Sequence, residues 1–123
     1  MMKALIFLLL SLLASCITRK DQVMCTEEFR SVTITVHGDT LDAHYTVRVS
    51  TGDTVFSAGI TFPWSGVYVV LDDSYRQPIE NRTEDFRFTG YVGDTLVVDE
   101  IFRISADRCH ISYVSGKTDI YLP

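Results

Sequence analysis

The chain contains few of the residues that several common classes of protein require. Among its 123 residues are three cysteines, three prolines and one tryptophan, and lysine and arginine number 11 against 16 aspartates and glutamates. The net charge of −5 argues against nucleic acid as a partner. No Gly-x-Ser-x-Gly motif and no glycine-rich phosphate loop occurs, because the seven glycines are scattered. The apolar fraction of 46% excludes a disordered chain.

The amino-terminal residues have the pattern of a targeting segment. A basic start, Met-Met-Lys, precedes eleven residues (4–14) that are apolar apart from one serine, a run too short to span a bilayer and typical of a signal peptide. The run ends in Leu13-Ala14-Ser15-Cys16, which resembles the bacterial lipobox. That resemblance implies a lipid on Cys16 and, because Ile17 is not aspartate, transport to the outer membrane of a Gram-negative bacterium. A plain cleavage site and a retained membrane helix are the alternatives.

The remaining chain divides simply. We expect a signal peptide over residues 1–15, a lipidated tether over 16–24 and one domain over 25–123. If Cys16 carries lipid, two cysteines remain, Cys25 and Cys109. Two cysteines in an oxidising compartment predict one disulfide between them. Two unpaired buried cysteines are the alternative, whereas no cysteine spacing suits a metal.

The composition after residue 15 favours strands. It includes thirteen valines and thirteen threonines but only three alanines. Apolar residues alternate over Val32–Val36 and again over Leu41–Val49, with Gly38-Asp39-Thr40 between them. A turn at Asp39-Thr40 would pair Val36 with Ala43 and place every apolar residue on one face. The sequence therefore predicts a hairpin with both of these side chains buried.

Further strands follow between turn-forming residues. We expect them over residues 54–62, 67–71, 86–92, 95–104, 109–114 and 118–122, with a polar loop over 72–85. A helix over 95–106 is the main alternative, because Val97, Glu100, Ile101 and Ile104 also fit a helical face. Seven or eight short strands predict an all-β, single-domain sandwich with no helix longer than two turns.

Three stretches resemble the transthyretin-like (prealbumin-like) β-sandwich family, in the form of the carboxypeptidase-regulatory-like domains of envelope proteins. They are Cys25-Thr26 before the strand at 31–36, Asp107-Arg108-Cys109-His110 before the last strands, and Phe86-Arg87-Phe88-Thr89-Gly90. A generic immunoglobulin-like sandwich is the alternative. The Tyr-Arg-Gly-Ser tail of the family's hydroxyisourate hydrolases is absent, so the resemblance does not imply that activity.

Candidate metal ligands are sparse. In the predicted hairpin, His37, Asp42 and His44 share the outward face and could bind Zn²⁺, but a solvated strand face is the favoured interpretation. Asp72, Asp73, Glu80, Glu84 and Asp85 surround the polar loop without a calcium-binding pattern. We expect no cofactor.

One segment offers an aromatic contact surface. Trp64 lies in the turn Phe62-Pro63-Trp64-Ser65-Gly66, and Tyr68 follows on the next strand. Tryptophan and tyrosine dominate binding hot spots and sugar-stacking platforms. Trp64 is therefore either a plug over the end of the sandwich or, with Tyr68, part of a binding site.

The sequence predicts binding in preference to catalysis. No nucleophile, base or metal-ligand set converges, so we expect a non-enzymatic envelope lipoprotein that is held on the membrane by its lipid and binds a protein or glycan. A small hydrolase, a metal-dependent enzyme or an inhibitor of an envelope enzyme is the alternative.

Overall fold

The computed structural model describes residues 24–56 and 65–123. The predicted signal peptide, Cys16 and Trp64 lie outside the described residues, and the expectations about them stay predictions.

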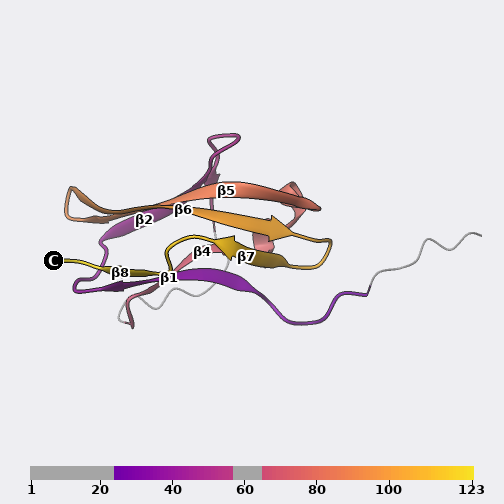
Figure 1. Cartoon of the computed structure of the whole chain (residues 1–123), viewed down its shortest axis with the longest axis horizontal. Helices are drawn as coiled ribbons and strands as arrows, with labels where there is room; N and C mark the ends of the chain where they lie inside the picture. Colours follow the sequence, from indigo (N-terminus) through magenta and orange to yellow (C-terminus); the bar gives the residue numbers. More distant parts are fainter. Residues whose placement is uncertain (1–23, 57–64) are drawn as a thin grey trace, which may run out of the picture.

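The described residues form two β-sheets packed against each other (Figure 1). The smaller sheet has the order β4-β1-β8 and the larger the order β3-β2-β5-β6-β7. In chain order the strands are β1 (Ser31–His37), β2 (Ala43–Arg48), β3 (Thr54–Val55), β4 (Val67–Asp72), β5 (Arg82–Val92), β6 (Thr95–Ala106), β7 (Ile111–Ser115) and β8 (Asp119–Tyr121). β1 and β8 run parallel, whereas the other neighbours are antiparallel. The predicted β-sandwich is confirmed.

Two short 3-10 turns lie wholly within the described residues, and no α-helix occurs among them. They are η2 (Asp73–Tyr75) and η3 (Gln77–Ile79), and both lie between β4 and β5. The carboxylate of Asp72 caps η2 by accepting from the Ser74 N–H at 3.0 Å. Residues 95–106, where a helix was the alternative, form β6. No helix in the described part of the chain is long and apolar enough to cross a membrane.

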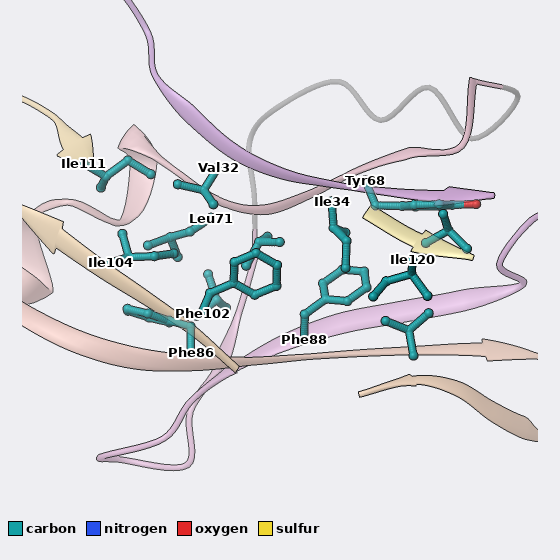
Figure 2. Close-up of a cluster of buried hydrophobic side chains, with 14 of the residues drawn as sticks. Val32, Ile34, Tyr68, Leu71, Phe86, Phe88, Phe102, Ile104, Ile111 and Ile120 are labelled. Carbon is teal, nitrogen blue, oxygen red and sulfur yellow. The ribbon is translucent and has the colours of Figure 1, made fainter. Parts of the chain in front are cut away.

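The core consists of large apolar side chains from both sheets. Val32, Ile34 and Val36 of β1 alternate with more exposed neighbours, as the period of two requires. They face a layer of aromatic rings from the other sheet, of which Phe86, Phe88 and Phe102 are labelled in Figure 2. Burial of each such side chain contributes about 1.5–3 kcal/mol, so this layer is the main source of stability.

The predicted hairpin is wrong. β1 pairs with β4 and β8, and β2 pairs with β3 and β5, so the two strands belong to different sheets. Val36 is buried as expected, but Ala43 is exposed and does not pair with it. After Gly38 the chain crosses to the other sheet, and Leu41 is buried on the way.

The inner face of β2 is also the opposite of the predicted one. Thr46 is 3% exposed, whereas Tyr45 is 44% exposed. The alternation of apolar and polar residues along a strand predicts that one of its faces is buried. It does not predict which other strands cover that face. Thr46 is tolerated inside because its hydroxyl donates to the Val70 carbonyl oxygen at 2.7 Å.

Candidate functional sites

Tyr68 belongs to the core and not to a contact surface. Its ring is fully buried between the sheets, as Figure 2 shows. Its hydroxyl accepts a hydrogen bond from the Leu41 N–H at 2.8 Å. The structure therefore gives Tyr68 no exposed surface with which to bind a partner, and Trp64 lies outside the described residues.

The three predicted metal ligands do not come together. His37 contacts Asp119, with 3.0 Å between Nε2 and Oδ1, and its ring stacks on Tyr121. His44 packs between the sheets, and burial lowers the pKa of its imidazole. The Asp42 carboxylate accepts from the Gly93 N–H. The cluster depended on the hairpin register, and no group of three potential ligands exists among the described residues.

The acids around the polar loop are likewise dispersed. Glu84 and Asp85 lie in β5, where Glu84 pairs with Arg48 and Asp85 with Arg103. Asp72 caps η2, whereas Asp73 points into the structure toward β7. The loop therefore does not gather its carboxylates around one cation.

The predicted disulfide between Cys25 and Cys109 is confirmed. The two Cα atoms lie 5.3 Å apart and close a separation of 84 residues. The bond fixes the segment that precedes β1 beside the start of β7. It therefore also brings Thr26, the neighbour of Cys25, toward His110, the neighbour of Cys109.

A hydrogen-bonded series of Thr26, His110 and Asp73 forms beside this disulfide. The Thr26 hydroxyl lies 2.8 Å from His110 Nε2, and His110 Nδ1 lies 2.7 Å from Asp73 Oδ2. The side chains of His110 and Asp73 are 9% and 6% exposed. Hydroxyl, imidazole and carboxylate occur in the order that nucleophilic hydrolases use.

The surroundings of Asp73 fix its carboxylate as an acceptor. Burial by itself would raise the pKa of Asp73, but the Arg30 N–H, the His110 ring and the Ile111 N–H outweigh it and lower that pKa. The two backbone N–H groups each lie 2.8 Å from a carboxylate oxygen. His110 Nδ1 therefore donates to Asp73, and Nε2 is the ring nitrogen that faces the Thr26 hydroxyl.

The same network also fastens the chain. Arg30 and Thr26 belong to the segment before β1, Asp73 to η2, and His110 to the approach to β7. The N–H groups of Cys109 and His110 both donate to Asp107 Oδ1, at 2.7 and 2.8 Å. These two donors are thus occupied and do not form an oxyanion hole. The geometry fits a structural fastening better than a catalytic centre.

Sequence reasoning missed this series, although it contained a usable signal. A disulfide between residues 25 and 109 implies that residues 26 and 110 are close together. The contribution of Asp73 could not be found in the same way, because it depends on how η2 folds back on β7.

A second feature is an open sheet edge on β6. Within the described residues, β7 pairs with β6 over Arg103 to Ala106. Gly116, in the following loop, lies close to Phe102, because a Cβ there would come within 2.6 Å of that ring. From Thr95 to Glu100, β6 therefore has β5 on one side and no described strand on the other.

An apolar hollow adjoins this open edge. It has a volume of about 450 Å³ and lies where the β5–β6 turn meets the end of β8, near the label C in Figure 1. Its apolar lining comes from Val92, Leu96, Val97 and Leu122, and Asp39 adds a carboxylate. Leu96 is 45% exposed. β8 also lacks a described neighbour on the side away from β1, so the hollow is flanked by two unpaired strand edges.

Comparisons with protein-family models, with curated proteins and with solved structures found no match to this chain.

Proposed function

We propose that this protein is a lipid-anchored binding module of the bacterial cell envelope and does no chemistry of its own. In this proposal Cys16 carries the lipid, the outer membrane of a Gram-negative bacterium holds the protein, and the sandwich is of the transthyretin-like type. The support for the anchor is the Leu13-Ala14-Ser15-Cys16 motif after an apolar run. The Cys25–Cys109 disulfide agrees with an oxidising compartment.

The observation that carries the binding proposal is the open edge of β6 beside an apolar hollow. An unpaired strand edge presents backbone N–H and C=O groups to which an extended peptide can add as a further strand. The hollow supplies a place for apolar side chains of that peptide. We therefore assign the partner to the class of proteins that offer an extended segment.

The binding site can be tested with an isotope-labelled protein and a display library of extended peptides. We expect the selected peptides to shift and protect the amides of residues 95–100 and those around Leu122. Perturbation confined to other strands, or no selected peptide at all, would contradict the proposal.

The anchor requires a separate test. Mass spectrometry of the protein from a Gram-negative host should find three acyl chains on Cys16, and Cys16→Ser should release the protein from membranes. An unmodified Cys16 in the mature protein would remove the anchor from the proposal.

A small hydrolase is the second candidate, because Thr26, His110 and Asp73 form a hydroxyl–imidazole–carboxylate series. In that reaction Thr26 Oγ1 would attack an ester carbonyl and its proton would pass to His110 Nε2. The acyl C–O bond would break as His110 returns the proton to the departing alcohol, and water would then hydrolyse the acyl-threonine to the free acid. The binding proposal predicts that p-nitrophenyl acetate is not turned over above the background rate. Turnover that is lost in Thr26→Ala and kept in Thr26→Ser would replace the proposal with a hydrolase.

A further inference from the structure

We propose that the open edge selects for charge: it accepts an extended segment of a partner protein that places a lysine or arginine opposite Glu100. This inference rests on the proposed function and names the chemistry of the partner. The residues that carry it lie in β5, β6 and the lining of the hollow.

Glu100 is the exceptional carboxylate of the β5–β6 pair. Among the described residues, Glu84 pairs with Arg48, Asp85 with Arg103, and Asp99 with Arg87. Glu100, by contrast, has no hydrogen bond or ion pair to any described residue. It is also half-buried, whereas Asp99 beside it is exposed.

The direction of Glu100 explains why it lacks a partner. It lies directly opposite Phe88 in the register of β5 and β6, and Phe88 is fully buried. Residues opposite each other on antiparallel strands share a face. Glu100 is therefore on the inner face of the sheet, at the point where the edge is open. Arg87 and Arg103 already have carboxylate partners, and Arg82 lies opposite Ala106 at the far end of the strand pair.

Addition of a strand at this edge would remove water from Glu100. A buried carboxylate without a cation is costly, and so is one placed beside a second acid. A lysine or arginine on the added strand would supply the missing charge, whereas a neutral side chain at that position would leave the carboxylate uncompensated. Glu100 thus favours one class of segment and disfavours the others.

A second copy of this chain does not meet the requirement. Two β6 edges placed together would bring Glu100 and Asp94 of one copy near the acids of the other, and each chain has a net charge of −5. An inward-pointing charge on an edge strand is a known means of blocking such pairing. The occupant that the charges favour is therefore a basic segment of a different protein.

The length of the edge defines the segment. Six residues, 95–100, correspond to about 20 Å of strand at roughly 3.3 Å per residue. Alternate residues of the added strand face inward, so one of them meets Glu100 and the one two positions away lies beside buried Val98. Beyond Val98 the register of β5 and β6 shifts and Leu96 lies opposite Tyr91, so the alternation is not extended further. The expected pattern is apolar-x-Lys/Arg, read in either direction.

The experiment uses three capped six-residue peptides of alternating valine and threonine that differ at one terminal inward position. That position is lysine, norleucine or glutamate, and binding to the full-length protein in detergent is followed by fluorescence anisotropy. We expect the lysine peptide to bind at least ten-fold more tightly than the norleucine peptide, with the glutamate peptide weakest. Glu100→Gln should abolish the ten-fold ratio, and Glu100→Lys should reverse the order of the lysine and glutamate peptides.

Asp94→Asn is the matched control, because it removes an exposed acid from the β5–β6 turn without changing the inner face. The ratio should persist in this variant and fall as salt is added. Equal binding of the three peptides would overturn the charge selection and leave strand addition intact, whereas no binding of any peptide would count against both proposals. The alternative is that Glu100 only blocks pairing between the β6 edges of two copies. Dimerisation of Glu100→Gln, together with no ten-fold ratio in the original protein, would establish this alternative and overturn the inference.

Discussion

Several polar side chains that are buried or nearly buried between the elements have a defined partner. Thr46 donates to a backbone carbonyl, Arg48 forms two hydrogen bonds with Glu84, and His110 bonds to Asp73. Among the described residues, no buried side-chain nitrogen or oxygen atom lacks a hydrogen-bond partner. Removal of one member leaves the other buried without a hydrogen bond. The free energy of unfolding should therefore fall by more than the intact pair contributes to it.

His110→Ala tests this expectation for the network beside the disulfide. The substitution takes from Asp73 a hydrogen bond that is almost completely buried, so we expect the free energy of unfolding to fall by about 1–3 kcal/mol in urea titrations. The matched control is His37→Ala, which removes an exposed pairing with Asp119 and should cost no more than about 1 kcal/mol. Equal losses in the two variants would contradict a fastening role for His110.

The Arg48–Glu84 pair should make stability depend on pH. Hydrogen bonds from Arg48 lower the pKa of Glu84 from 4.5 to about 2, although burial opposes them. Because the folded-state pKa is depressed, the contribution is complete above about pH 4.5 and is lost as the pH falls toward 2. The carboxylate is 13% exposed, so we expect a contribution of roughly 2–3 kcal/mol over this window.

Urea unfolding between pH 7 and pH 2 measures this contribution. Glu84→Gln should flatten the profile between pH 4.5 and 2. Asp85→Asn should leave it nearly unchanged, because the Asp85–Arg103 pair is exposed. A profile that Glu84→Gln does not alter would show that other carboxylates determine the acid sensitivity.

The connections between strands set which sheet each strand joins. The segment after β1 crosses to the other sheet by burying Leu41, and the backbone N–H of Val36 bonds to the carbonyl of Gly66 just before β4. Gly66 has a φ of +72°, and a Cβ there would lie 2.6 Å from the Val36 carbonyl oxygen. The start of β4 therefore requires a residue without a side chain.

Gly66→Ala and Gly93→Ala separate two reasons for which a position requires glycine, namely a positive φ and a lack of space for a Cβ atom. Both positions have positive φ, which costs a non-glycine residue about 1 kcal/mol, but a Cβ at Gly93 would meet no atom within 4 Å. We expect Gly93→Ala to lower the free energy of unfolding by about 1 kcal/mol and Gly66→Ala by about 2–4 kcal/mol, since the clash is with backbone. Thermal unfolding of both variants checks this, and equal effects would contradict close packing of Gly66 against β1.

At the scale of the whole molecule, the disulfide closes almost the entire described chain. Cys25 precedes β1 and Cys109 precedes β7, so 84 positions separate them. In the chain-entropy model a loop of this length corresponds to about 4.5 kcal/mol of stabilisation. The Cys25→Ser/Cys109→Ser variant should lose about that much in urea unfolding.

Thr26→Val is the control for the disulfide. It removes the hydrogen bond to His110 and keeps the covalent bond, so it should lose much less stability than the double serine variant. A loss below about 1 kcal/mol in the double variant would mean that the unfolded chain is already compact.

Much of the fold could be predicted because strands and their buried faces follow from local pattern. The alternation in β1 and the glycine-containing turn at Gly93 indicated their structures correctly. The cysteine count indicated the disulfide, which implies the Thr26–His110 contact. The position of Asp73 and the unpaired state of Glu100 were not predictable, because each depends on which strands become neighbours.

The sequence by itself therefore determined the all-β class, the disulfide and the burial of the apolar face of β1. Only the tertiary structure decided that β1 and β2 lie in different sheets and that the polar side of β2 faces inward. It also decided that no described strand pairs with β6 on the side away from β5 over residues 95–100. The physical reason is that side-chain alternation depends on one strand alone, whereas partner choice depends on competition among all strands for the same backbone hydrogen bonds and apolar surfaces.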